Sequence, residues 1–303
     1  MTMKKIVALL FFCFSTAAWA MTYDLPAPSN ALIGNIQYSF AHANDSVPMV
    51  AQRYDLGLNA VVGANPTFHP RRLLSAGAPV VLPTAHLIPP LPRQGIVINL
   101  PEMRLYFFPK GAGKVMTYPI GIGRIGMTIP ITQTAIVRKA KNPVWVPTAH
   151  IREYNREQGI ILPKRMPAGP DNPLGPYAIY SGIPTYLIHS TVFPESIGRR
   201  ASFGCIRMYE EDIKTFFPLV KRGMPVAIIN MPTKVAWIDN HLYLESHVPL
   251  EEHSKASNAT LAHVVSQISA TTQDHEALVD WQLVAYLDKE RDGVPHDVGV
   301  RLS

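Results

Sequence analysis

The sequence predicts a mainly β protein with short helices, preceded by a small α+β module and followed by a hairpin-plus-helix extension. Three observations support this fold class. Strand-like segments separated by Gly and Pro turns fill residues 95–230, helical spacing appears between residues 46 and 65, and a hairpin followed by helical spacing lies beyond residue 230. A chain of 303 residues with 47% hydrophobic content can form one substantial core and smaller modules beside it.

The first twenty residues are typical of a secretory signal. Two early lysines precede an apolar run over residues 6–14, and Ala18-Trp19-Ala20 provides a small-x-small cleavage site. The run is too short to span a bilayer, so we expect no transmembrane segment in the mature chain. Phe12 is bulky where lipoprotein signals carry a small residue, so we expect cleavage after Ala20, with Cys13 lost. The predicted location is the periplasm.

Residues 22–35 are rich in Pro, Ala and Asn and are expected to form a lead-in without structure of its own. A strand-helix-helix-strand module follows over residues 37–84. Its first helix begins after Ser46, and its second helix ends at Asn65. The proline-rich segment 88–94 is predicted to be a stiff linker that ends the module.

From Gly95 the pattern changes to strands, which begin with a hairpin over residues 96–108 and end with a strand over 225–230. A short helix is expected over 150–159, a loop over 162–176, and a helix that begins near Tyr209. The remaining strands are predicted at residues 115–122, 134–137, 177–180 and 185–188. The segment GIGRIG matches a dinucleotide-binding pattern, but Pro130 and β-branched residues follow where a phosphate-binding helix would begin, so its glycines are interpreted as turns.

The last segment, residues 231–303, is predicted to contain a hairpin over 235–244, a polar linker over 250–258, and helices over 261–268 and 276–289. His263 and His275 fall on the polar faces of the helical patterns. We expect both to be solvated and not to be ligands.

Charge and cysteine use exclude several function classes. Removing the two signal lysines lowers the formal net charge from +6 to +4, which favours contact with an anionic envelope polymer. The sequence shows no basic block and no paired Cys/His ligands, so neither nucleic-acid binding nor a structural zinc site is supported. The mature chain keeps one thiol, Cys205, and therefore cannot form an intramolecular disulfide in an oxidising compartment.

The segment from His189 to Arg207, HSTVFPESIGRRASFGCIR, places a histidine and a cysteine sixteen residues apart. A thiol needs a nearby base to become a strong nucleophile, and His189 is the candidate base for Cys205. The pattern therefore predicts thiol acyl-transfer chemistry. The alternative is a buried cysteine that only packs as a small hydrophobe.

Four segments in order, YPIGIGR, NPVWVP, MPAGPDNPLGPYAI and LIHSTVFPESIGRRASFGCIRM, resemble the bacterial L,D-transpeptidase catalytic domain over residues 95–230. The resemblance implies a β-sandwich-like fold, with Cys205 as nucleophile and His189 as base. It also places Arg207 and Ser202 at the substrate and implies no cofactor and no metal. Residues 37–84 resemble a LysM module, a family that binds N-acetylglucosamine-containing glycans; the alternative is a module that only packs.

A reaction through an acyl-enzyme needs two further groups: donors for the oxyanion and a group that orients the imidazole. The backbone N–H groups of Gly204 and Cys205 are candidate oxyanion donors. The Ser190 hydroxyl could orient the imidazole, or a backbone carbonyl could do so instead. Ser190 stands where many family members have glycine, Phe203 where many have a polar residue, and Thr132 where a glycine usually follows Thr-Pro-x. The sequence therefore predicts no particular conformation for the loop before Thr132.

The resemblance implies partners and a reaction. The enzyme would act on peptidoglycan stem peptides and glycan, releasing the terminal D-alanine of a tetrapeptide stem. It would then either form 3-3 cross-links or attach an outer-membrane lipoprotein to peptidoglycan. Two alternatives remain: an L,D-carboxypeptidase, in which water takes the acyl group, and a wall-binding protein that does not react. The C-terminal segment resembles the extension of the family members that act in the Gram-negative periplasm.

Overall fold

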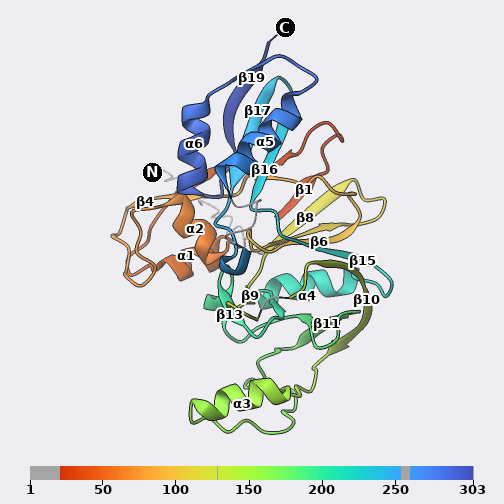
Figure 1. Cartoon of the computed structure of the whole chain (residues 1–303). Helices are drawn as coiled ribbons and strands as arrows, with labels where there is room; N and C mark the ends of the chain where they lie inside the picture. The colour runs from red at the N-terminus through yellow and green to blue at the C-terminus, as the bar shows by residue number, and fades with distance from the viewer. Residues whose placement is uncertain (1–20, 128, 254–259, 303) are drawn as a thin grey trace, which may run out of the picture.

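The centre of the protein is a nine-stranded sheet. The computed structural model describes residues 21–127, 129–253 and 260–302, and the predicted signal lies outside them. The strand order is β1-β8-β7-β6-β15-β10-β11-β12-β14 (Figure 1). The bounds are β1 Met21–Asp24, β8 Lys114–Pro119, β7 Arg104–Phe108, β6 Gly95–Asn99, β15 Pro225–Ile229, β10 Thr132–Lys141, β11 Tyr177–Ser181, β12 Leu187–His189 and β14 Ile206–Arg207. The mainly β prediction is confirmed.

The two central strands β6 and β7 are buried along their whole length, because both faces of the sheet are covered. Helix α4 (Glu210–Leu219) packs on one face, where the Phe216 ring centroid lies 5.3 Å from that of Phe107 and 5.1 Å from that of Tyr118. On the other face, a second cluster contains Ile33 and Ile88 from the N-terminal segments. A sheet covered on both faces carries continuous apolar runs such as Ile96–Ile98, where a half-exposed sheet would alternate.

The predicted strand-helix-helix-strand module is present as β3 (Gln37–Phe40), α1 (Val47–Arg53), α2 (Leu58–Ala64) and β4 (Pro79–Leu82). It has its own apolar core around Val50, Leu56 and Val61. The module docks on the catalytic domain through backbone groups. The N–H groups of Leu58 and Asn59 donate to the carbonyls of residues 197 and 198, at 3.1 and 3.2 Å.

The C-terminal segment folds as a separate four-stranded sheet with two helices, at the top of Figure 1. Its strand order is β16-β17-β19-β18, and β16 with β17 forms the predicted hairpin. The bounds are β16 Thr233–Ile238, β17 His241–Ser246, η2 Glu251–His253, α5 Leu261–Thr272, β18 Ala277–Val279, α6 Trp281–Glu290 and β19 His296–Arg301.

Three predictions at the ends of the chain need correction or lie outside the described residues. The lead-in is structured: β1 pairs with β8, and β2 (Leu32–Ile33) pairs with β5 (His86–Leu87). The helix expected from residue 276 begins at Trp281, because Ala277–Val279 pairs with β19, a strand that the pattern did not predict. Most of the predicted polar linker, residues 254–258, lies outside the described residues.

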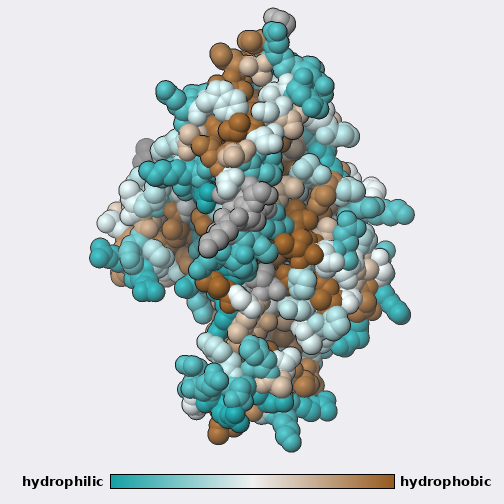
Figure 2. Space-filling model, in the orientation of Figure 1, coloured by the Kyte–Doolittle hydropathy of each residue, from teal (hydrophilic) through white to brown (hydrophobic). Residues whose placement is uncertain are grey.

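Just before Cys205, strand β13 (Arg200–Ser202) pairs in parallel with β9 (Ile122–Gly123) and forms a small two-stranded sheet. The turn η1 (Pro194–Ser196) and helix α3 (Ala149–Glu157) complete the described elements. Helix α3 projects at the lower end of the molecule in Figure 1, and Figure 2 shows mostly hydrophilic side chains there.

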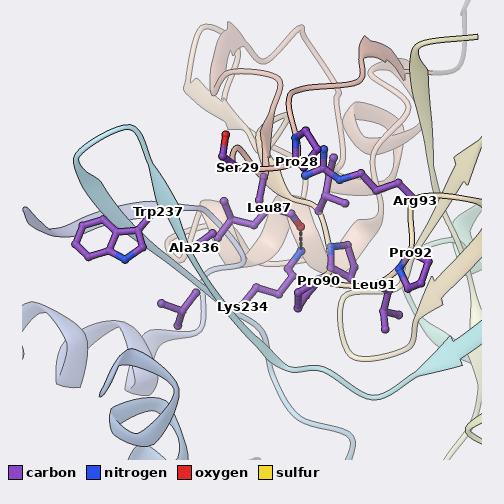
Figure 3. A pocket seen from close by; sticks show the side chains of 14 residues that line it. Pro28, Ser29, Leu87, Pro90, Leu91, Pro92, Arg93, Lys234, Ala236 and Trp237 are labelled. Carbon is purple, nitrogen blue, oxygen red and sulfur yellow. Dashed lines mark hydrogen bonds between the residues drawn. The ribbon is translucent and has the colours of Figure 1, made fainter. Parts of the chain in front are cut away.

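A cavity of about 710 Å³ lies between the proline-rich segment 88–93 and β16. Lys234 reaches across it to the Leu87 carbonyl at 2.6 Å, and Arg93 and Trp237 point in different directions at its sides (Figure 3). None of the residues that line this cavity belongs to the Cys205 segment.

Among the described helices, none combines the length and apolar composition needed to cross a bilayer.

Candidate active site

The predicted nucleophile and base lie at neighbouring strands. Strand β12 pairs in parallel with β14, with His189 opposite Arg207 and Ile188 opposite Ile206. Side chains two residues apart on a strand point to the same face. Cys205 directly precedes β14, so the pairing brings the thiol, the imidazole and the Arg207 side chain to one side of the sheet edge.

The turn that presents the cysteine is held by Ser202. The Ser202 hydroxyl accepts from the Gly204 N–H at 3.0 Å and donates to the Cys205 carbonyl at 2.6 Å. Gly204 has a φ of +108°, and a Cβ there would lie 2.5 Å from the Tyr186 ring and 2.9 Å from the Met127 carbonyl. Glycine is therefore required for backbone conformation and for space. Ser202 is 2% exposed, which differs from its predicted place at the substrate.

The base is oriented by a carbonyl. Nδ1 of the buried His189 contacts the backbone oxygen of Ser190. A carbonyl only accepts, so Nδ1 carries the proton and Nε2 keeps the free lone pair that a base needs. Burial, followed by the positive charge of Arg207, lowers the pKa of His189 to about 4. The imidazole is therefore neutral at physiological pH.

The Ser190 hydroxyl has a different role from the one predicted. It donates to the Leu174 carbonyl at 2.9 Å and accepts from the Tyr177 N–H at 3.1 Å. These two bonds fasten the end of the predicted loop 162–176 to the strand that carries His189. Of the two orienting groups considered for the imidazole, the backbone carbonyl is the one in contact.

The thiol is neutral in this structure. Cys205 Sγ donates to the Thr185 carbonyl at a sulfur–oxygen distance of 3.6 Å. Burial raises the pKa of the thiol, although the Leu187 N–H and the Arg207 charge act in the opposite direction. The hydrogen bonds described for Cys205 and His189 do not join the two side chains. The site therefore holds a neutral thiol and a neutral imidazole, not a preformed thiolate.

Arg207 supplies a cation beside the thiol. Its backbone exchanges two hydrogen bonds of 2.9 Å with Gly121, which fixes the position of the residue. The guanidinium carbon lies 5.8 Å from the Phe193 ring centroid, and Nε is buried without a partner among the described residues. An unpaired buried N–H is costly, so this group is suited to a ligand oxygen.

Sequence reasoning did not find the aromatic cluster around Phe203. The Phe203 and Tyr154 rings meet edge to face at 5.1 Å, and the Arg124 guanidinium carbon lies 4.3 Å from the Phe203 centroid and 4.9 Å from that of Tyr154. In the sequence, Phe203 stands out only as an apolar residue where many family members have a polar one. Its partners are some 50 and 80 residues earlier, so no local pattern indicates them.

One cluster could hold a metal by donor type: His86, Glu102 and Glu245, whose ligand atoms lie within 4.8 Å of one another. The Lys234 ammonium lies 3.0 Å from Glu102 and 2.7 Å from Glu245. That ammonium already lies between the two carboxylates, where a metal ion would have to sit, so the donor set does not fit a divalent cation.

Comparisons with known proteins show which family the chain is similar to. The YkuD family model, the L,D-transpeptidase catalytic domain, matches residues 93–228. The chain is 39% identical to "Probable L,D-transpeptidase YcfS" of Escherichia coli K12, over 96% of this chain and 94% of that protein. It is 36% identical to "Probable L,D-transpeptidase YbiS" of the same strain, over 97% and 98%.

A third relative is "Probable L,D-transpeptidase ErfK/SrfK" of Salmonella typhimurium LT2, which is 41% identical over 77% of this chain and 76% of that protein. Among solved structures, L,D-transpeptidase 3 of Mycobacterium tuberculosis is 17% identical over 53% of this chain and 72% of that chain, with a TM-score of 0.35. Identity of 36–39% over nearly the whole length of the two Escherichia coli relatives places the chain: it belongs to the L,D-transpeptidase family of enzymes, which acts on peptidoglycan.

Proposed function

We propose that this protein is a periplasmic L,D-transpeptidase that acts on peptidoglycan tetrapeptide stems through a Cys205 thioester. The observation that supports this most directly is the parallel pairing of β12 with β14, which brings His189 and Arg207 side by side with Cys205 next to them. The predicted signal over residues 1–20 supports export.

In the acylation step, Cys205 Sγ attacks the carbonyl carbon of the amide between the L-centre of stem residue three and the terminal D-alanine. The thiol proton passes to Nε2 of His189 and then to the leaving nitrogen, so D-alanine departs as an amine and a thioester remains. Because both groups begin neutral, the proton moves as the sulfur attacks, which is general-base catalysis.

Negative charge develops on the carbonyl oxygen during this attack. The Gly204 N–H is already donated to Ser202, so we assign the principal oxyanion donor to the Cys205 N–H. One such donor contributes about 3 kcal/mol of transition-state stabilisation. The unpaired Nε of Arg207 is assigned to a carboxylate of the stem peptide, with Ser202 acting through the turn.

In the second step, an amine attacks the thioester, gives its proton to Nε2 and restores the thiol. The amine is either the diaminopimelate side chain of another stem, which gives a 3-3 cross-link, or a lysine of an outer-membrane lipoprotein. Water in place of the amine would make the enzyme an L,D-carboxypeptidase.

The test is to incubate purified protein with disaccharide-tetrapeptide and to resolve the products by mass. A cross-linked dimer supports transpeptidation, and a trimmed stem supports hydrolysis. No change with the wild-type protein would support the alternative of a wall-binding protein that does not react. Cys205→Ala should abolish either product, and a variant that keeps wild-type turnover would exclude the thioester.

A further inference from the structure

Two carboxyl groups face each other where the N-terminal module meets the catalytic domain. Asp55 lies two residues after the end of α1, with a φ of +52°, and Asp212 lies in the first turn of α4 and is 5% exposed. The two side chains are within hydrogen-bonding reach of each other. Both Oδ2 atoms are buried and accept no hydrogen bond from the described residues. Two ionised carboxylates have no proton to donate, so neither group can supply a hydrogen bond to the other unless the pair holds a proton.

The backbone nitrogen of Met21 lies at this pair, and its N–H donates to the Asp55 carboxyl. Met21 is fixed on both sides. Its backbone pairs with Thr117 in the main sheet, and its side chain packs against the module core and accepts from the Tyr23 hydroxyl at 3.2 Å. The nitrogen is therefore positioned by the fold, independently of the carboxyls.

The surroundings leave the two carboxyls short of positive charge. The positive charge of Arg104 lowers the pKa of both aspartates, but its Nε also lies 3.6 Å from Oε1 of Glu102. The other groups that face the pair are Glu211, which is acidic, and the phenols of Tyr23, Tyr118 and Tyr209. Burial raises the pKa of both aspartates. The charges of Asp55 and Glu211 raise the pKa of Asp212 further, and the charge of Arg104 lowers it.

We propose that the Asp55–Asp212 pair is the binding site for the α-ammonium group of Met21, created when the chain is cleaved between Ala20 and Met21. A signal-cleaving endopeptidase adds water across this amide: the C–N bond breaks, Ala20 leaves as a carboxylate, and the Met21 nitrogen becomes a protonated amine. A neutral N–H with one donor is replaced by a cation with three. This inference rests on the export signal proposed above and not on the transpeptidation reaction.

The ion pair would fasten three parts of the molecule together: β1, the module and α4. Asp55 and Asp212 line a cavity of about 480 Å³ together with Thr191 and Pro194, which belong to the segment leading from His189 toward Cys205. Nearby, the Tyr209 hydroxyl donates to the Leu56 carbonyl at 3.0 Å. Removal of the leader therefore strengthens the contact between the module and the catalytic segment, and the uncleaved precursor is the less stable form.

The experiment compares three versions of the protein: one that begins at Met21, released from a cleavable fusion; one that retains Trp19 and Ala20; and one that begins at Met21 with its α-amine acetylated. We expect the thermal midpoint at pH 7 to be highest for the free amine, by about 3 °C or more. The difference should disappear in the Asp55→Asn/Asp212→Asn protein. It should persist in Asp24→Asn, which changes an exposed carboxylate on the same strand.

A second measurement uses the unaltered protein. The pH dependence of α-amine acetylation should give a pKa above the ordinary value of about 8 for a chain terminus, and the two-asparagine variant should return it to that value. Equal thermal midpoints for free and acetylated proteins, or a difference that survives both asparagine substitutions, would overturn the proposal. N-terminal sequencing of the exported protein would also overturn the proposal if the first residue is not Met21. That result would leave the Cys205 chemistry untouched.

Discussion

At the residue scale, the site pairs an acid that is hard to ionise with a base that stays neutral. Burial shifts the pKa values of Cys205 and His189 apart, so proton transfer in the resting enzyme is unfavourable. In the mechanism proposed above, the thiol leaves the Thr185 carbonyl when the substrate carbonyl is presented to it. A thiol that stays protonated is also less exposed to oxidation, because the thiolate is the form that oxidants attack.

The first prediction concerns the pH dependence of kcat/KM on a soluble tetrapeptide. His189 must be neutral to accept a proton, and its pKa of about 4 keeps it neutral over the usual working range. We expect the acid limb of the profile to have its midpoint near pH 4, with a plateau above about pH 5. A midpoint between pH 6 and 7 would show instead that the imidazole titrates as an ordinary histidine.

The same shift has a consequence for stability. The pKa of His189 is lower in the folded protein than in the unfolded chain, so between pH 6.5 and 4 the unfolded chain binds more protons. The contribution of His189 to stability is therefore fully present above pH 6.5 and is lost as the pH falls toward 4.

The second prediction concerns Gly204→Ala. The positive φ and the contact with Tyr186 both oppose a side chain, so we expect a loss of about 1–3 kcal/mol of stability and a large loss of turnover, because the turn sets the Cys205 N–H. Gly111→Ala is the matched control: its φ is +72°, but nothing lies within 4 Å of the added carbon. Equal effects of the two substitutions on turnover would contradict the role of the turn.

Individual residues differ in how far the sequence could identify them. Cys205 and His189 could be proposed from the sequence because Cys205 is the cysteine outside the predicted signal and a histidine lies in the same motif. The function of the Ser190 hydroxyl was not identifiable, because its partners Leu174 and Tyr177 are chosen by the path of a loop. A contact between side chains far apart in the sequence is set by tertiary packing, which local patterns do not encode.

At the element scale, helix α3 depends on the Phe203 cluster. The helix has no buried residue of its own, and nine residues form a marginal helix in isolation. Tyr154 of the helix packs against Phe203, with the Arg124 guanidinium over both rings. The aromatic residue before Gly204 therefore joins the helix to the nucleophile turn.

The third prediction is that Phe203→Ala releases α3. Amide hydrogen exchange over residues 149–157 should become at least tenfold faster, because the edge-to-face contact and the cation-π contact are worth about 1 kcal/mol each. Ile161→Ala is the control, since that side chain is exposed in the loop after α3. Unchanged protection of α3 in the Phe203 variant would mean that the loops at its ends hold the helix.

Elements were predictable where their pattern was local. The hairpins β6-β7 and β16-β17 have adjacent strands and a turn between them, so alternation and turn residues were sufficient. Strand β1 was not predicted because its four residues pair with Lys114–Thr117, some ninety positions away. Strand β18 likewise depends on its pairing with β19 across α6, and an isolated three-residue segment carries no periodic signal.

At the scale of the whole molecule, a buried charge network joins the C-terminal extension to the catalytic domain. Lys234 of β16 contacts Glu102, Glu245, the Leu87 carbonyl and the Tyr106 hydroxyl. Burial alone would raise the pKa of Glu102, but Lys234 and its other cationic neighbours lower it to about 2. The stability that ionised Glu102 contributes is therefore present above pH 4.5 and is lost as the pH falls toward 2.

The fourth prediction is that Lys234→Met destabilises the protein by about 3–5 kcal/mol in urea denaturation, because two buried carboxylates lose their counter-charge. Lys114→Met is the matched control. Lys114 pairs with Asp24 on the surface, and an exposed pair contributes about 1 kcal/mol or less. Similar losses for the two variants would show that water reaches the network and screens it.

The last prediction tests the glycan binding that the LysM resemblance implies for the N-terminal module, which would tether the enzyme to peptidoglycan. Deleting the whole N-terminal region would also remove β1 from the main sheet, so point substitutions are the cleaner probe. Tyr38 and Phe40 lie on the same face of β3 and are 75% and 66% exposed. We take this pair of exposed rings as the candidate glycan surface, because flat apolar rings suit the faces of sugars.

We expect Tyr38→Ala/Phe40→Ala to weaken sedimentation with purified sacculi at least fivefold while leaving turnover of a soluble tetrapeptide unchanged, since neither ring lies in the Cys205 site. Tyr286→Ala, which removes an exposed ring from the C-terminal extension, controls for nonspecific adhesion and should sediment like the wild type. If the double variant binds sacculi as well as the wild type does, β3 is not the glycan surface. If it binds less but also reacts more slowly with the soluble substrate, the module contributes to the fold of the catalytic site through its docking on residues 197 and 198, and tethering is not its separate role.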